Sequence, residues 1–320
     1  MMNAAVLHTI GKPPRFERFI DPDPGEGEVI VHVHSAALKP VDKQLASGSH
    51  YASPRKLPVV CGIDGVGHLD DGTRVFFGGP RRPYGAMAEH TVVRREQCFP
   101  VPDGLDDEIV AAIPNPGVSA WLSLKQRARL TPGETVLVLG ATGVTGKVAV
   151  QIARILGAGR VVAAGRNEAV LNTLHHLGAD ETIRINQPNR DLIEAFRRAA
   201  GEKGFDVILD YLWGAPTEAL LAAIARAEFA AAGTETRLVE VGESAGPIIT
   251  LPASVLRGAP LTILGTAGIP PREVLTDALQ QVTNHAAQGL LKVDCERVAL
   301  SEIEGAWERD SNGRRLVVIP

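Results

Sequence analysis

Two patterns of hydrophobic and polar positions follow one another along the chain. Residues 1–117 carry short strand-like runs broken by Gly and Pro, such as 28–34 and 73–77. Clusters of turn-forming residues separate these runs, as at 21–25. This part of the chain is therefore predicted to form a small, mostly β domain.

From residue 118 onwards, strand-like runs alternate with helical segments. The runs are rich in Val, Leu and Ile and comprise 135–140, 160–165, 181–185, 205–211, 237–242 and 261–265. Runs of this kind are typical of parallel strands that helices bury on both faces. Val144, Val148 and Ile152 follow the first run at helical spacing. The alternation predicts an α/β fold with a doubly wound parallel sheet over residues 118–270.

The last segment, 271–320, begins with a helical stretch over 273–288 and then returns to short extended runs. This change of pattern indicates that the segment rejoins the first domain. The sequence therefore predicts three parts, 1–117, 118–270 and 271–320, of which the first and third belong together.

Composition and charge exclude several classes of partner. The 320 residues, 45% of them hydrophobic, suffice for two domains with substantial cores. A formal net charge of −4 without a basic run argues against nucleic acid. A membrane is not expected, because no stretch reaches the ~18 apolar residues that a bilayer requires. The start of the chain lacks a signal-peptide pattern, and its three cysteines are scattered, so a reducing cytoplasm is expected.

The most informative segment is a glycine-rich turn between the first long apolar run and the following helix. Its predicted pyrophosphate-binding residues are Ala141, Thr142, Gly143, Val144, Thr145 and Gly146. Ala141, Gly143 and Gly146 occupy the three glycine positions of a dinucleotide fingerprint, with alanine in the first. Gly143 lets backbone amides approach a phosphate, and Gly146 lets the helix pack closely on the strand. A tight turn without a ligand is the alternative explanation.

The end of the second strand indicates which dinucleotide binds. A carboxylate there would bind the ribose of NAD, whereas this chain has Gly165, Arg166 and Asn167. A guanidinium group can pair with a 2′-phosphate, and Arg184 at the end of the third strand can add a second positive charge. NADPH is therefore the predicted cofactor. The alternative for Arg166 is a solvated surface arginine.

Several motifs, in their order and spacing, resemble the zinc-independent quinone oxidoreductase branch of the medium-chain dehydrogenase/reductase superfamily. They are the glycine-rich loop at 139–146, an "NPxD"-like segment at 36–42, a glycine-rich stretch at 58–67, a "GxxAE"-like turn at 85–90 and a "GxTA"-like helix at 117–121. Lys39 stands where the second motif usually has Asn, and Ser119 stands where the last has Thr.

The resemblance implies a specific architecture and assembly. Both chain ends would form a GroES-like, mostly β catalytic domain, with a Rossmann domain between them. A homodimer is also implied, with the strand at 261–265 at the sheet edge where two subunits would join.

No metal site is expected. Zinc-dependent relatives place Cys, His and Cys near positions that here hold Lys39, Ile63 and Pro114. Catalytic zinc needs about three protein ligands, and the paired histidines of this chain have no evident third partner. Without a Lewis acid, a quinone or another conjugated carbonyl is the favoured hydride acceptor, because its charge is delocalised after transfer.

The resemblance also suggests residues near the reacting groups. Tyr51 is the first candidate to donate a hydrogen bond to the substrate, and Lys39 and His50 are further candidates for a proton or a hydrogen bond. Asp42 would orient its neighbours, with a structural role in the turn as the alternative. Ser119 is expected near the nicotinamide. Val241, Gly242 and Gly265 end later strands and are expected near the cofactor, because ligands bind beyond the carboxyl ends of such sheets.

Two other functions stay open at this point. The first is an NADPH-dependent reductase of the carbon–carbon double bond in enones or 2-alkenals, which would use the same fold and cofactor. The second is a non-catalytic NADPH-binding sensor or accessory protein, for which the unusual Lys39 leaves room.

Overall fold

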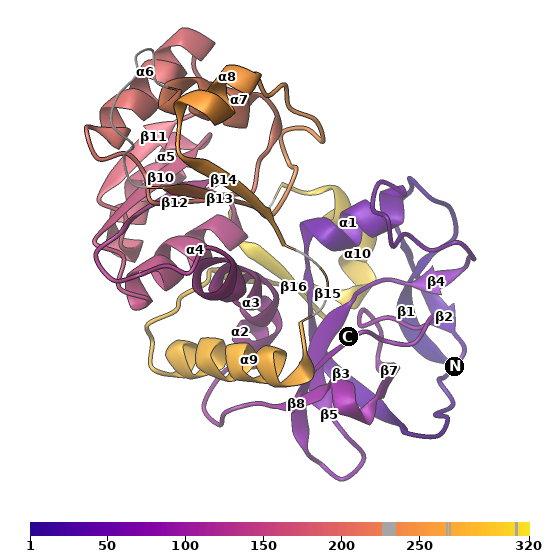
Figure 1. Cartoon of the computed structure of the whole chain (residues 1–320). Coiled ribbons are helices and arrows are strands. Elements are labelled where there is room, and N and C mark those ends of the chain that lie inside the picture. Colours follow the sequence, from indigo (N-terminus) through magenta and orange to yellow (C-terminus); the bar gives the residue numbers. More distant parts are fainter. Residues whose placement is uncertain (226–234, 267, 269, 311–312) are drawn as a thin grey trace. The chain divides into compact units, whose positions relative to one another are not determined.

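The computed structural model describes residues 1–225, 235–266, 268, 270–310 and 313–320. The chain divides into two compact units (Figure 1). Unit 1 comprises Met1–Pro114 and Thr283–Pro320, and unit 2 comprises Asn115–Val282. The second division lies inside helix α9 (Arg272–Ala287), whereas the sequence pattern predicts a boundary before this helix. Most of α9 belongs to unit 2, because Val282 packs against Gly117 of helix α3 (Pro114–Leu122).

Unit 1 is built mainly from antiparallel strands. Its strands are β1 (Met2–Leu7), β2 (Arg15–Phe19), β3 (Glu28–Leu38), β4 (Val59–Val60), β5 (Asp64–His68), β6 (Arg74–Gly78), β7 (His90–Arg94), β8 (Cys98–Pro100), β15 (Cys295–Ala299) and β16 (Arg315–Ile319). Within the described residues they form a sheet of order β2-β1-β4 and a larger sheet of order β15-β16-β3-β5-β6-β8, with β7 also paired to β3. Because β16 pairs with β3, the end of the chain lies in the first unit.

Three helices accompany these strands in the described part of unit 1: α1 (Pro40–Ser47), α2 (Asp107–Ala112) and α10 (Ile303–Glu308). The core contains Leu7, Val33 and Phe77 from the strands together with Ile303 and Trp307 of α10. Residues from both ends of the chain therefore share one hydrophobic core, which holds the α1 segment in a fixed place.

Unit 2 contains a parallel sheet of order β11-β10-β9-β12-β13-β14. Its strands are β9 (Thr135–Leu139), β10 (Arg160–Gly165), β11 (Glu181–Arg184), β12 (Val207–Asp210), β13 (Thr236–Glu240) and β14 (Leu261–Gly265). The chain winds outward from β9 in one direction to β11 and in the other to β14. The predicted doubly wound parallel sheet is thus confirmed, and the point where its winding reverses lies between β9 and β12.

Helices cover both faces of this sheet (Figure 1). The helices of unit 2 after α3 are α4 (Val144–Ile155), α5 (Glu168–Thr173), α6 (Asn189–Ala200), α7 (Gly214–Ile224), α8 (Ala253–Gly258) and α9. Phe196 of α6, Leu220 of α7 and Val255 of α8 pack on one face together with Leu137 of β9. The central strands β9 and β12 are buried except for the half-buried Thr135, but β14 is only half-buried because it forms the edge of the sheet.

None of the helices in the described part of the chain has both the length and the apolar character needed to cross a lipid bilayer.

Candidate functional site

A glycine-rich turn joins β9 to α4 at the carboxyl edge of the parallel sheet. Gly140 has a φ of +88°, which favours glycine, and the Gly140 and Ala141 amides each donate to the Ala164 carbonyl at 2.9 Å. Gly143 is the N-cap residue of α4 and offers no side-chain acceptor to the first helical turn. The partial positive charge of these first-turn amides therefore suits a phosphate group.

Two further glycines keep this turn compact. A Cβ added to Gly146 would lie 2.3 Å from the Gly140 carbonyl oxygen, which is far inside van der Waals contact. A Cβ added to Gly165 would lie 2.4 Å from the Thr142 Cγ2 atom. By contrast, a Cβ on Gly143 would meet only the Gly140 oxygen at 3.6 Å, so the space beside the Gly143 Cα is open. The predicted loop residues thus form a close-packed cradle with one open side.

The ends of β10 and β11 bring two arginines to the same edge of the sheet. Gly165 pairs in register with Arg184, and Arg166 follows directly as an exposed residue. Arg184 donates to the Glu168 carboxylate at 3.3 Å, whereas Arg166 has no ion pair with any residue that the structure describes. Asn167 accepts from the Val170 amide at 3.2 Å and so caps α5. Arg166 therefore keeps a guanidinium group that can bind a ligand, and Asn167 has a structural role there.

Tyr211 follows β12 at the reversal point of the sheet, within a strand-end stretch, 210–214, that the sequence predicts to border the cofactor. Its Cβ lies 3.2 Å from the position that a Cβ on Gly140 would take. The Tyr211 hydroxyl is buried and has no hydrogen-bond partner in the described structure. Burial raises the pKa of this hydroxyl, which therefore stays protonated as a donor. A buried donor without a partner costs free energy, so an acceptor that reached this hydroxyl would satisfy it.

The remaining predicted cofactor residues of unit 2 lie in three places. The amides of Val241 and Gly242, after β13, donate to the Asp210 carbonyl at 2.8 and 3.2 Å and so lie beside Tyr211. Gly265 is the exposed last residue of edge strand β14, paired in register with Glu240. Ser119 lies half-buried on α3. The structure therefore groups Val241 and Gly242 with the reversal point, and it places Gly265 at the sheet edge.

In unit 1, Lys39 belongs to a buried cluster of charges rather than to an open surface. Its side chain is 1% exposed, and its Nζ atom lies 2.8 Å from Asp64 Oδ1 and 3.3 Å from Asp42 Oδ2. The ammonium group also donates to the Ala37 carbonyl at 2.9 Å. Arg315 on β16, likewise buried, donates to the Leu38 carbonyl at 3.1 Å. Two cations and two carboxylates thus balance one another inside unit 1.

This environment decides the protonation state of Lys39. Burial by itself lowers the pKa of Lys39, but the carboxylates of Asp42 and Asp64 more than offset that effect, so its pKa lies above the ordinary value. Asp42 accepts hydrogen bonds from the amides of Lys39, at 2.9 Å, and Ile63, at 3.3 Å. Both residues therefore hold α1 and the segment before β5 in place, and Lys39 retains its proton at neutral pH.

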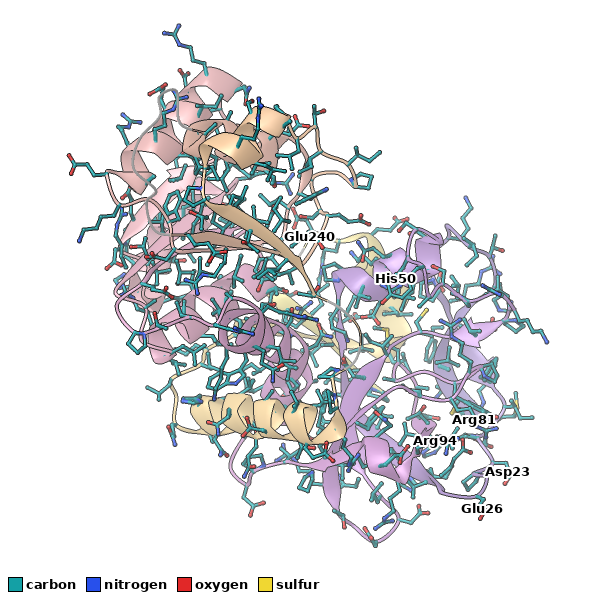
Figure 2. All side chains as sticks on the ribbon, in the orientation of Figure 1. Asp23, Glu26, His50, Arg81, Arg94 and Glu240 are labelled. Atoms are coloured by element: carbon teal, nitrogen blue, oxygen red, sulfur yellow. The ribbon has the colours of Figure 1, made fainter. Side chains whose placement is uncertain are left out.

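Tyr51, the first candidate for a hydrogen bond to substrate, lies on the surface of unit 1. Its side chain is 96% exposed, and its ring packs on that of His50 with centroids 4.2 Å apart. His50 in turn accepts from the Ala52 amide at 3.1 Å through Nδ1. The segment after α1 therefore presents two titratable rings, and Figure 2 marks His50 at the end of that helix.

Comparisons with known proteins agree with this geometry. The family model described as "Zinc-binding dehydrogenase" matches residues 144–284. Pig quinone oxidoreductase is 33% identical over 225 residues, which cover 66% of this chain and 67% of the pig protein. A probable NADPH-dependent quinone reductase of Emericella nidulans is 26% identical over 362 aligned positions and is covered completely, as is this chain. Among solved structures, quinone oxidoreductase from Thermus thermophilus, determined also with NADPH, matches with a TM-score of 0.83, 29% identity and full coverage of both chains.

The chain belongs to the medium-chain dehydrogenase/reductase superfamily, in its quinone oxidoreductase branch. The fold class predicted from the sequence, a Rossmann sheet together with a GroES-like, mostly β domain, is confirmed by these relatives and by the two units. The matched family model begins at residue 144, so it includes none of the positions 39, 63 and 114 at which zinc-dependent relatives were expected to carry ligands.

Proposed function

We propose that this oxidoreductase uses NADPH to reduce a quinone or a similar conjugated carbonyl, without zinc. The cradle formed by the glycine turn and the start of α4, with Arg166 beside it, carries the proposal. The open side of Gly143 admits a pyrophosphate, while Arg166, which has no ion pair within the described residues, offers its guanidinium group to a 2′-phosphate. Relatives named as NADPH-dependent quinone reductase, or solved with NADPH, support the same cofactor.

The chemistry that this chain must supply is modest. When bound, NADPH provides a hydride, which together with one proton converts a quinone into a hydroquinone. The protein has to hold the cofactor, orient the acceptor and admit a proton. Lys39 is an unsuitable proton donor, because it is buried and its two carboxylate partners hold its proton. Tyr51 and His50 have the accessible protons and stay the proposed donors.

Zinc independence is inferred from the side chains at the three positions where zinc-dependent relatives are expected to carry metal ligands. Lys39, Ile63 and Pro114 stand where metal ligands would be required, and neither Ile nor Pro has a donor atom in its side chain. No group of three or more His, Cys, Asp or Glu among the described residues could hold a metal ion. The ammonium group of Lys39 moreover places a positive charge between Asp42 and Asp64, the carboxylates that lie near the expected ligand positions.

A comparison of two acceptors tests the proposed reaction. Steady-state oxidation of NADPH is measured with 9,10-phenanthrenequinone and with a medium-chain 2-alkenal, and the quinone is expected to give the larger kcat/KM. A larger kcat/KM for the alkenal would instead assign the chain to the double-bond reductases. Binding of NADPH without turnover of either acceptor would identify a sensor or accessory protein.

We further propose a homodimer that joins through β14 and a cytoplasmic location. β14 is the half-buried edge strand of the parallel sheet, so its outer side is available for pairing with a second copy. Cys61, Cys98 and Cys295 are not in disulfides among the described residues, which is compatible with the proposed reducing compartment.

A further inference from the structure

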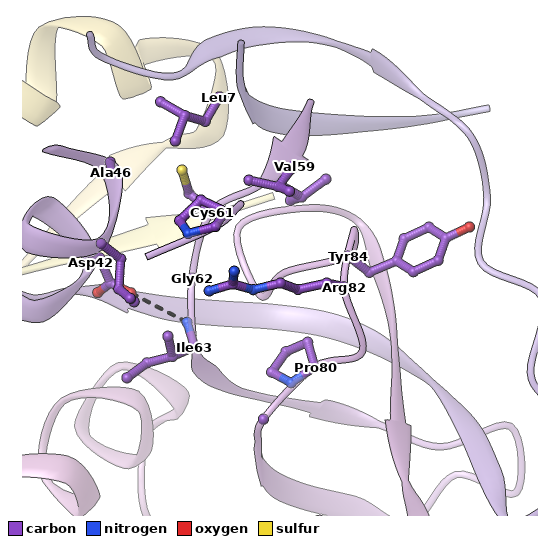
Figure 3. A pocket seen from close by; sticks show the side chains of 14 residues that line it. Leu7, Asp42, Ala46, Val59, Cys61, Gly62, Ile63, Pro80, Arg82 and Tyr84 are labelled. Atoms are coloured by element: carbon purple, nitrogen blue, oxygen red, sulfur yellow. Dashed lines mark hydrogen bonds between the residues drawn. The ribbon is translucent and has the colours of Figure 1, made fainter. Parts of the chain in front are cut away.

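Unit 1 contains a pocket of about 230 Å³ between α1 and the segments 59–63 and 79–84. Its wall is largely apolar and includes Leu45, Val59, Cys61 and Ile63. Arg82 extends along this wall, with its guanidinium group directed toward Gly62 and away from Tyr84 (Figure 3). The pocket therefore combines the walls suited to a flat hydrophobic ring with one cationic group.

Among the described residues that line the pocket, Arg82 carries a charge that no neighbouring charge compensates. Asp42 also lines the pocket, but Lys39 lies 3.3 Å from its Oδ2 atom and the Ile63 amide donates to its Oδ1 atom at 3.3 Å. Arg82 has no carboxylate at salt-bridge distance in the part of the chain that the structure describes. The pocket therefore favours a ligand that carries a carbonyl oxygen or a negative charge over a cationic one.

One hydrogen bond holds the Arg82 side chain in position. Its Nη2 atom donates to the Ala52 carbonyl at 2.6 Å, so the arginine links the 79–84 segment to the loop that follows α1. A guanidinium group has five N–H donors, so this bond leaves others for a ligand. The Ala52 contact thus orients the group without consuming its binding capacity.

We infer that this pocket binds the ring of the quinone and that Arg82 selects quinones with an anionic or carbonyl substituent on that ring. The inference rests on the proposed function in one respect, namely that the ligand is a quinone. The Cys61 thiol in the wall is compatible with this electrophilic ligand. Burial raises the pKa of Cys61, which keeps the thiol protonated and hence a poor nucleophile toward a quinone.

The test uses two quinones that differ in charge, neutral 1,4-naphthoquinone and anionic 1,4-naphthoquinone-2-sulfonate. In Arg82→Gln, kcat/KM for the sulfonate is expected to fall about tenfold or more, as for the loss of one charge-assisted hydrogen bond. For the neutral quinone the expected fall is about threefold or less, because only a neutral hydrogen bond is lost. Arg82→Lys keeps the charge and is expected to retain part of the preference for the sulfonate.

Arg81 offers a matched control next in sequence. It pairs with Glu28 at 3.1 Å and donates to the Asp23 carbonyl at 2.7 Å, and it is not among the residues that line the pocket. Figure 2 labels Arg81 and Asp23 in the same region of unit 1. Arg81→Gln is expected to leave the ratio of the two kcat/KM values unchanged. Equal losses for both quinones in Arg82→Gln, or the same change of ratio in Arg81→Gln, would overturn the assignment.

A measurement of quinone binding tests the pocket independently of the proposed reaction. Isothermal titration of the sulfonated quinone, with and without NADPH, reports on the pocket even if no turnover occurs. Binding that weakens in Arg82→Gln but not in Arg81→Gln supports the pocket, even if failure of NADPH oxidation removes the proposed reaction. Equal binding to all three proteins removes the pocket while leaving a measured quinone reductase activity intact.

Discussion

Lys39 shows that one substitution within a motif can change the role of that position. The resemblance to quinone oxidoreductases predicts asparagine at this position, and the sequence suggested a lysine that touches substrate. The structure instead buries the ammonium group between Asp42 and Asp64. Asp64 lies 25 residues further along the chain, so the pairing depends on tertiary structure that the local pattern does not contain.

Removal of the Lys39 charge is expected to destabilise unit 1 strongly. Lys39→Met leaves Asp64 buried without its cation, which should lower the free energy of unfolding by about 3–5 kcal/mol. Urea titration followed by circular dichroism measures this change. The double variant Lys39→Met with Asp64→Asn should recover only part of the loss, because Asp64 is then no longer an unpaired carboxylate whereas Asp42 still lacks its cation. A single variant as stable as the parent would show that the cluster does not contribute.

The same cluster predicts how stability depends on alkaline pH. The folded pKa of Lys39 lies above its ordinary value of 10.5, so its contribution to stability is complete below that pH. Above it, the unfolded chain loses the proton first, and the contribution falls as pH rises toward the folded pKa. The stability difference between the parent and Lys39→Met should therefore be constant near neutral pH and shrink above 10.5. A difference that grows at alkaline pH would contradict this sign.

Arg166 and Arg184 differ in a way that the sequence alone did not reveal. Both are exposed at strand ends, but within the described residues only Arg184 has a carboxylate partner, Glu168. Arg166→Ala is expected to raise the Kd for NADPH about tenfold or more and to change that for NADH less than about twofold. Fluorescence titration measures both constants, and Arg184→Ala serves as a control with a smaller effect on NADPH. Equal losses for both dinucleotides would exclude Arg166 as the phosphate-reading group.

At the scale of elements, the sequence was most informative where local geometry dominates. The six apolar runs correspond to β9 through β14, and the helix after the glycine turn begins at Val144, because buried strands and tight turns leave direct composition signals. The pocket beside Arg82 left no such signal. It is assembled from α1 and two separate loop segments, and these meet only in the folded unit.

Two glycines of the turn allow a matched comparison. Gly146→Ala places a Cβ 2.3 Å from the Gly140 carbonyl oxygen, so α4 must move away from β9. The expected cost is about 1–3 kcal/mol of stability, together with weaker NADPH binding. Gly143→Ala meets no atom closer than 3.6 Å, so it should cost less than about 1 kcal/mol yet crowd the phosphate side. Thermal melts and NADPH titrations of both variants distinguish packing from binding. Unchanged NADPH affinity in Gly143→Ala would place the pyrophosphate elsewhere.

At the scale of the whole molecule, the edge strand β14 makes the oligomeric state testable. The proposed dimer should sediment with twice the mass of the chain. Thr262→Pro removes one backbone donor from the edge strand and should shift the protein toward a monomer. Thr262 also pairs with Arg237 of β13, so the same change can weaken the sheet itself. Circular dichroism therefore has to show that the variant is folded. A parent protein that sediments as a monomer at micromolar concentration would remove the dimer from the proposal.

The pairing of β16 with β3 affects the order in which the two units fold during synthesis on the ribosome. Arg315 reaches the Leu38 carbonyl across a separation of 277 residues, and Leu316 pairs with Leu38 itself. A nascent chain cannot close this ladder until Leu316 and its neighbours in β16 have been synthesised. Residues 115–282, in contrast, form a contiguous unit and can fold while synthesis continues. Unit 2 is thus expected to fold first, and unit 1, which contains the pocket beside Arg82, waits for β16.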